Sequence, residues 1–190
     1  MGTTQKHGSK AIEQAIERVA AAISARHPHP ARLLLLGIAN GGIELASRLV
    51  ARLHAAGLKA GSGTIDISFH RDDIGRNPIP KESSPTLVPH DVNGATVILV
   101  DDVLYSGRTV KAALDELFDH GRPAGVELAV LVDRGGRRLP IAADYCGLTV
   151  PAEEADKIVV HLDSLNPALD SITVLTPAVK AGKSKLRPVT

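Results

Sequence analysis

The clearest hydrophobic pattern in the chain is the run Val97–Val100, which is short, rich in β-branched residues and free of polar alternation. Such a run predicts a buried strand. Asp101 and Asp102 follow it directly, a loop of small and polar residues comes next, and apolar positions then recur at helical spacing to about His120. A strand, an acidic pair, a glycine-containing loop and a helix in this order are typical of the ligand crevice of an open α/β sheet.

Similar patterns predict the elements on either side of this stretch. Helical periodicity indicates helices over 10–26 and 43–56. Short apolar or alternating runs indicate strands over 32–36, 64–69, 126–132, 158–162 and 171–175. The alternation of strands and helices predicts the α/β class, with an open and mostly parallel sheet flanked by helices. At 190 residues, the chain is expected to form a single domain.

Composition narrows the classes of protein to which the chain can belong. Basic and acidic residues nearly balance, at a formal net charge of +1, so no general basic field favours nucleic acid. The single cysteine, Cys146, excludes an intramolecular disulfide framework and a cysteine-based metal cluster. Residues 1–10 are polar, and no apolar run approaches the roughly 20 residues of a membrane span. We therefore expect a soluble cytoplasmic protein with no membrane partner.

Two glycine-containing turns at the ends of predicted strands supply the candidate chemistry. Loop amides and the positive end of a helix dipole suit a phosphate, both after Asp102 and in the turn 37–42. The carboxylates of Asp101 and Asp102 instead suit neutral hydroxyls or a hydrated divalent cation. One ligand with a phosphate at one end and a diol beside it would satisfy both groups. The opposing interpretation of the acidic pair is a capped turn with solvated charges.

A specific family resemblance rests on the same stretch. Val97–Thr109 resembles the phosphoribosyl pyrophosphate (PRPP) signature of type I phosphoribosyltransferases. Leu104–Ser106 and the later Val130–Gly135 narrow the resemblance to the pyrimidine operon attenuation protein family, PyrR, which is also a uracil phosphoribosyltransferase. The similarity extends from about Ala11 to Leu175. It implies the type I phosphoribosyltransferase fold, with a small hood and a flexible lid loop beside the sheet.

The resemblance implies a PRPP site made of two loops, with Mg²⁺ bound together with PRPP. Asp101 and Asp102 would be catalytic and would hold the ribose hydroxyls or the metal. The PRPP-binding residues would be Ala39, Asn40, Gly41 and Gly42 in the first loop, and Val103, Leu104, Tyr105, Ser106, Gly107, Arg108 and Thr109 in the second. The family usually carries Lys-Thr-Arg at 39–41, so two cationic side chains are missing from this chain.

Further expectations concern the regions around these loops. A lid loop is expected at about 70–92, where Arg71 would be a catalytic cation near the departing pyrophosphate. A hood is expected at about 133–150, and uracil would be recognised by Val132, Asp133, Arg134 and Ile141, mostly through backbone groups. The phosphoribosyltransferase domain would span 10–176, between a disordered N-terminus at 1–9 and a basic tail at 177–190.

The expected function is uracil phosphoribosyltransferase in pyrimidine salvage, with uracil and PRPP giving UMP and pyrophosphate. The alternative is an RNA-binding transcriptional attenuator that senses UMP or UTP. The family's Thr-Arg…His pattern on the first helix appears here as Glu17-Arg18…Ala21, and a glutamate would repel phosphates. We therefore place RNA as a partner below PRPP and uracil. A transferase for another base, or one that lacks activity, also stays open. The resemblance further implies a homo-oligomer, a dimer or higher.

Overall fold

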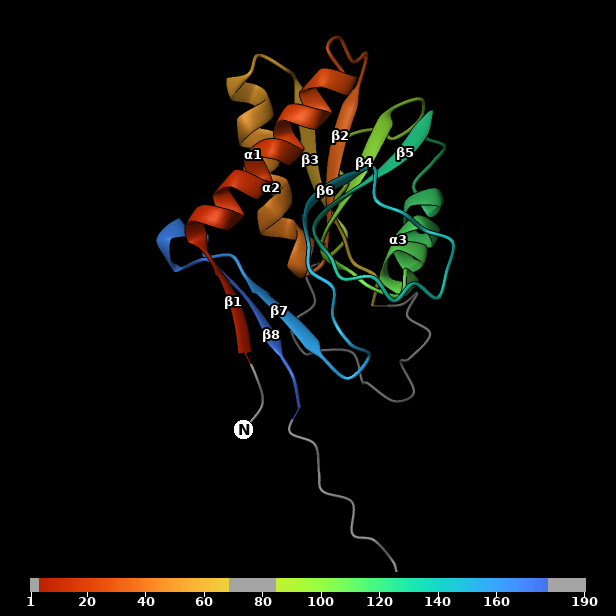
Figure 1. Cartoon of the computed structure of the whole chain (residues 1–190). Helices are drawn as coiled ribbons and strands as arrows, with labels where there is room; N and C mark the ends of the chain where they lie inside the picture. Colours follow the sequence, from red (N-terminus) through yellow and green to blue (C-terminus); the bar gives the residue numbers. More distant parts are fainter. Residues whose placement is uncertain (1–3, 69–84, 178–190) are drawn as a thin grey trace, which may run out of the picture.

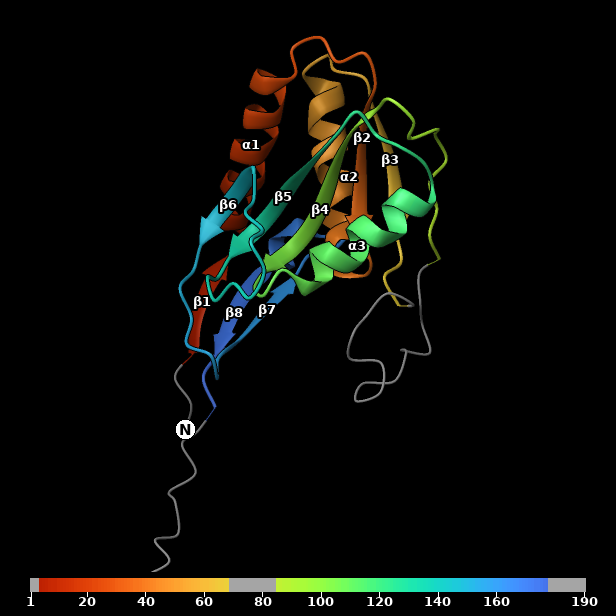
Figure 2. The same ribbon diagram turned by 90° about the vertical axis from the view of Figure 1, so that its right-hand side faces the viewer.

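The computed structural model describes residues 4–68 and 85–177. Its centre is a five-stranded sheet in the order β3-β2-β4-β5-β6, in which every neighbouring pair is parallel. The strands are β2 (Leu33–Ile38), β3 (Ala60–Ile65), β4 (Thr96–Leu104), β5 (Gly125–Asp133) and β6 (Tyr145–Thr149). Helices α1 (Ser9–Arg26) and α2 (Gly41–Ala55) lie on one side of this sheet and α3 (Arg108–Asp119) lies on the other (Figures 1 and 2). This confirms the predicted α/β class with an open parallel sheet.

Burial of the strands explains the uninterrupted apolar runs in the sequence. All six residues of β2 are buried, because helices cover both faces of the sheet. Leu33 and Leu35 pack with α1 and α2, whereas Leu34 and Leu36 point to the opposite face and pack with α3. Among the helices that the structure describes, none is long and apolar enough to cross a membrane.

A second, three-stranded antiparallel sheet joins the two ends of the chain. It has the order β1-β8-β7, with β1 at Thr4–Gly8, β7 at Lys157–His161 and β8 at Ser171–Leu175. A short 3₁₀ helix, η1 (Pro167–Leu169), connects β7 and β8. In Figure 1 this sheet lies below the parallel one. The two late strands that the sequence predicts are therefore confirmed.

Several predicted boundaries differ from the structure. Residues 4–8, expected to be disordered, form β1, because β8 offers a free edge to which a polar segment pairs through its backbone. The strand expected at 64–69 lies at 60–65 instead, since glycines at 61 and 63 interrupt the apolar signal of β3. Residues 145–149, expected in a hood, form β6 at the edge of the main sheet. Residues 70–84 of the predicted lid lie outside the described residues, and so does nearly all of the predicted basic tail.

Candidate functional site

The site begins where two neighbouring strands end at different heights. β2 pairs with β4 only as far as Gly37 and Val100, and the chain then turns into α2. β4 continues beside β5 for four more residues, to Leu104. Asp101 and Asp102 therefore lie just beyond the end of β2, at the carboxyl edge of the sheet. This edge is where open α/β sheets bind ligands.

A cavity of about 480 Å³ occupies this edge. It is lined by residues of the turn before α2, of the acidic pair and of the loop before α3, together with one residue that follows β3: Ala39, Gly41, Ile67, Asp101, Asp102, Val103, Tyr105, Ser106, Arg108 and Thr109. The structure thus brings together seven of the predicted PRPP residues and both aspartates. Ile67 was not predicted, and its sequence carries only an apolar strand signal.

Two glycines let the turn before α2 come close to β4. A Cβ built on Gly42 would lie 1.9 Å from the carbonyl oxygen of Val100, and one built on Gly41 would lie 2.5 Å from Cγ of Asp102. Side chains at these positions would push α2 away from the strand. The first turn of α2 consequently lies next to the carboxylate of Asp102.

Burial raises the pKa of both carboxyls of the acidic pair. Asp101 is only 5% exposed, and desolvation, followed by repulsion from Asp102, raises its pKa well above the ordinary range. Desolvation also raises the pKa of Asp102. Oδ1 of Asp101 accepts a hydrogen bond from the backbone N–H of Asp102, at 3.0 Å. Because water solvates these carboxylates poorly, a ligand with hydroxyl donors, or a divalent cation, would stabilise their charged forms.

The loop before α3 presents donors to the same cavity. Gly107 adopts φ +91°, the left-handed region that favours glycine, and is the residue that precedes the helix. The first turn of α3 carries no acidic residue and begins with Arg108 and Thr109, both exposed. The helix N-terminus therefore offers amides, a hydroxyl and a positive dipole end to an anion.

The four residues predicted to bind uracil lie behind this loop, and none of them lines the cavity in the described part of the chain. Val132 is fully buried in β5, and Asp133 is ion-paired with Arg137. Arg134 is 7% exposed and donates to backbone carbonyls of the 150–156 segment. Ile141 packs against Gly107.

The other predicted PRPP residues support the site from its edges. Leu104 is buried, and Asn40 and Gly42 belong to the turn that carries Ala39 and Gly41. Arg71 lies outside the described residues. Arg137 was not predicted to contribute to the site, because its sequence surroundings are those of a basic turn on the surface.

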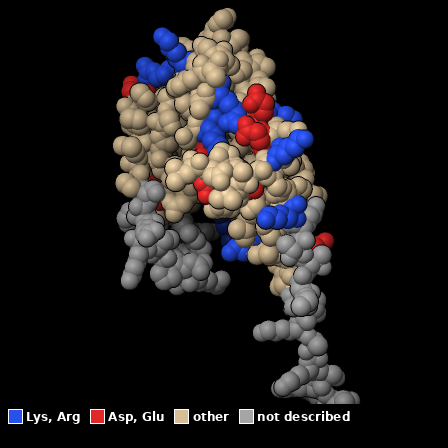
Figure 3. Space-filling view, turned by 90° about the vertical axis from the view of Figure 1, so that its left-hand side faces the viewer, with Lys and Arg blue, Asp and Glu red and all other residues tan. Residues whose placement is uncertain are grey.

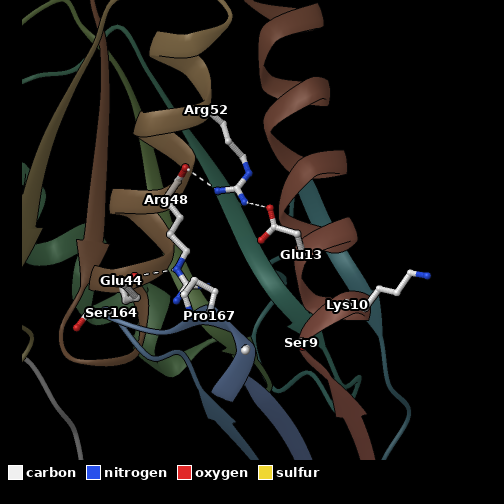
Figure 4. A pocket seen from close by; sticks show the side chains of 9 residues that line it. Ser9, Lys10, Glu13, Glu44, Arg48, Arg52, Ser164 and Pro167 are labelled. Carbon is white, nitrogen blue, oxygen red and sulfur yellow. Dashed lines mark hydrogen bonds and ion pairs between the residues drawn. The ribbon is translucent and has the colours of Figure 1, made fainter.

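A larger cavity, of about 630 Å³, lies between α1, α2 and the β7–β8 connection (Figure 4). Both of its arginines have acidic partners: Arg48 contacts Glu44 and Asp170, and Arg52 contacts Glu13. Arg48 also donates to the carbonyl of Asp163, at 2.6 Å. These contacts hold the β7–β8 connection against α2, so we interpret this region as one that stabilises the fold.

Comparison with known proteins gives the family. The phosphoribosyl transferase domain family matches residues 3–165. A bifunctional protein PyrR from Roseiflexus sp. (strain RS-1) is 41% identical over 184 residues, which cover 96% of this chain and 100% of the relative. Another, from Halalkalibacterium halodurans, is 45% identical over 168 residues, covering 87% of this chain and 93% of the relative.

Solved structures share the fold at lower identity. The hypoxanthine phosphoribosyltransferase of Trypanosoma cruzi superposes with a TM-score of 0.66 at 23% identity, covering 90% of this chain and 94% of that one. A hypoxanthine-guanine phosphoribosyltransferase from Bacillus anthracis gives a TM-score of 0.60 at 19% identity, covering 76% and 80%. The cavity, the two loops and these matches agree: the chain is a phosphoribosyltransferase and belongs to the PyrR family.

Proposed function

We propose that the chain transfers the phosphoribosyl group of PRPP to N1 of uracil, giving UMP and pyrophosphate. The observation that carries the proposal is the placement of an acidic pair, with Asp101 buried and Asp102 half-buried, beside two turns that each lead into a helix, all in one cavity. PRPP has a diol between two phosphate groups, so it matches this order of donors and acceptors. The relatives' name, bifunctional protein PyrR, supports a pyrimidine-linked activity.

Each part of the site has a role in this reaction. The loop from Ser106 to Thr109 would bind the 5′-phosphate, and the turn at 39–42 would bind the pyrophosphate through its amides. Asp101 and Asp102 would accept hydrogen bonds from the ribose hydroxyls. The bond from C1′ to the pyrophosphate oxygen breaks, the bond from N1 to C1′ forms, and the proton of N1 leaves to solvent. Positioning and electrostatics account for the acceleration, and no covalent nucleophile is needed.

The donor set also fits Mg²⁺. Two adjacent carboxylates in one cavity suit a hydrated divalent cation, with water and substrate oxygens as its other ligands. Asp101 and Asp102 would hold the ion, which would stabilise the negative charge of the leaving pyrophosphate. Among the described residues, no group of three or more His, Cys, Asp or Glu side chains could hold a metal ion. An ion held by Asp101 and Asp102 would therefore take its other ligands from water and the substrate.

The test is Asp102→Asn in an assay with PRPP, Mg²⁺ and uracil. We expect turnover to fall by at least about a hundredfold, because the amide places a donor where the ribose hydroxyls or the cation need an acceptor. Circular dichroism should show an unchanged fold. Turnover like that of the wild type would remove Asp102 from the mechanism.

RNA-binding attenuation is the second candidate function, favoured by the word bifunctional in the relatives' names. The charges on the α1 side argue against it. Figure 3 shows acidic side chains next to basic ones on this face, and Arg52 contacts both Glu13 and Glu17. Arg18 donates to the carbonyl of Gly147, at 2.8 Å. Titration of the protein with a pyrimidine-operon leader RNA, with and without UMP, tests this function; saturable binding that UMP strengthens would support it.

We also propose that the chain acts as a homo-oligomer. Leu165 and Leu169 in the β7–β8 connection are 94% and 58% exposed, and a second copy of the chain that packed on this connection would bury them. Light scattering after size-exclusion chromatography would test this, and a monomeric mass at micromolar concentration would contradict it.

A further inference from the structure

We infer that Arg137 and Arg134 are positioning residues that hold the phosphate loop, defined here as residues 104–107, from the side opposite to the ligand. This inference rests on the proposed function, because it concerns how the same cavity binds PRPP. Neither arginine is among the residues that line the cavity of the acidic pair. Both instead line a separate hollow of about 230 Å³, on the far side of Tyr105.

Arg137 holds the backbone of the loop. Its Nη1 donates to the carbonyl oxygens of Leu104, at 3.2 Å, and Tyr105, at 2.8 Å. Its Nε donates to the carbonyl of Ile141, at 3.0 Å, and its Nη2 pairs with the carboxylate of Asp133. One planar guanidinium thus connects the end of β4, the end of β5 and the segment that follows. A charged, forked donor gives both strength and direction to such contacts.

Backbone hydrogen bonds extend the same contact along the loop. The N–H of Arg134 donates to Leu104 O, at 3.2 Å, and the N–H groups of Arg138 and Leu139 both donate to Ser106 O, at 3.0 and 3.1 Å. The carbonyls of 104, 105 and 106 therefore all point toward the 134–141 segment. Because a trans peptide directs its N–H opposite to its C=O, the following amides point away from that segment. This arrangement prepares the amides of the loop for an anion before the ligand arrives.

Arg134 holds the ring of Tyr105. Its guanidinium carbon lies 3.9 Å from the ring centroid. Nη1 donates to Asp156 O, at 3.1 Å, and Nη2 donates to Glu153 O, at 2.7 Å, so the guanidinium is fixed from behind. On the same ring, Cε2 would lie 2.5 Å from a Cβ built on Gly136. Tyr105 is thereby held in place at the wall of the PRPP cavity.

These contacts distinguish recognition of uracil from positioning of the phosphate loop as the role of Arg134 and Arg137. If Arg134 recognised uracil, its substitution would raise KM for uracil. Since both of its terminal nitrogens donate to backbone carbonyls, substitution should instead disturb the phosphate loop and raise KM for PRPP. The same direction holds for Arg137.

The test compares Arg137→Gln, Arg137→Lys and Arg134→Lys in the full chain. The control is Arg138→Gln, which keeps the backbone bond to Ser106 and removes a side chain that is 59% exposed and, in the described part of the chain, pairs only with the exposed Glu154. We expect KM for PRPP to rise about tenfold in Arg137→Gln and less in Arg137→Lys, as one charge-assisted contact to the loop is lost or weakened. KM for uracil should stay within about twofold, and the control should match the wild type.

A spectroscopic readout accompanies the kinetics. The chain contains two tyrosines and no tryptophan, and Tyr145 binds Glu127 in a separate cluster. A change in the near-ultraviolet dichroism of Arg134→Lys, absent from the control, would therefore report Tyr105. An unchanged KM for PRPP in Arg137→Gln, or a rise confined to KM for uracil, would overturn the inference.

Calorimetric titration with PRPP and Mg²⁺ distinguishes this inference from the proposed function, since it needs no base. A wild-type chain that binds PRPP, with about tenfold weaker binding in Arg137→Gln, supports the inference even if the base is not uracil. Equal binding by both proteins refutes it. If the wild type binds no PRPP, the proposed function fails and the inference fails with it. A variant that does not fold is replaced by Arg137→Lys, for which the same outcomes apply.

Discussion

The Arg48–Asp170 ion pair offers a perturbation whose cost follows from the structure. The side chain of Asp170 is 1% exposed and that of Arg48 is 10% exposed. The two carboxylate oxygens accept from Nη1, at 2.5 Å, and from Nη2, at 3.2 Å, and Oδ1 also accepts from the N–H of Asp163, at 2.8 Å. In Asp170→Asn the amide keeps the shape of the carboxylate, but it removes the charge and turns an NH₂ group toward the guanidinium.

The expected cost lies near the lower end of the range for a broken buried pair. Removing one partner of such a pair costs about 3–5 kcal/mol. Arg48 keeps Glu44, at 2.7 Å, and the carbonyl of Asp163, so we expect the free energy of unfolding to fall by about 3 kcal/mol. For a chain of this length each kcal/mol lowers Tm by roughly 2–4 °C, so Tm should fall by roughly 6–12 °C.

Urea denaturation followed by circular dichroism measures this difference. Asp115→Asn is the matched control, because it removes the same charge from an exposed pair with Lys111. The control should change the free energy of unfolding by less than about 1 kcal/mol. A loss in Asp170→Asn that is no larger than in Asp115→Asn would show that burial does not strengthen the Arg48 contact.

Two further predictions concern buried polar groups. Asp101→Asn should raise Tm at pH 7 by a few degrees while abolishing turnover. The pKa of Asp101 is raised in the folded state, so the folded state binds more protons than the unfolded state. The carboxyl of Asp101 therefore lowers the free energy of unfolding as pH rises from its unfolded pKa toward its folded pKa. The gain should shrink below pH 4, and a Tm that falls at pH 7 would contradict it. Tyr145→Phe should lower the free energy of unfolding by about 1–2 kcal/mol in urea denaturation, because it removes the 2.6 Å hydrogen bond to Glu127; an unchanged value would contradict it.

Local patterns predicted the part of the fold that carries the chemistry. Val97–Val100, the acidic pair and the following helix are contiguous in sequence, so their order alone places the carboxylates at the end of a strand. The turn at 39–42 was predicted for the same reason. The structure adds that β4 continues beyond the acidic pair, because β5 remains beside it after β2 has ended.

Contacts between distant segments could not be predicted. β1 forms only because β8, more than 160 residues later, offers an edge to it. Arg134 and Arg137 give the sequence signal of a basic turn, and their fixed positions depend on carbonyls of β4 and of the 150–156 segment. Composition carries no signal for such contacts. Ile67 lines the cavity just after the end of β3, and the apolar pattern of the sequence indicates only that its side chain is buried.

A single product analysis tests whether this cavity joins uracil to the phosphoribosyl group. The wild-type chain is incubated with PRPP, Mg²⁺ and equal concentrations of uracil, guanine, hypoxanthine and orotate, and the nucleotides formed are separated and identified. We expect UMP as the dominant product, with formation that depends on both PRPP and Mg²⁺. A different nucleotide as the dominant product, or no nucleotide at all, would contradict it.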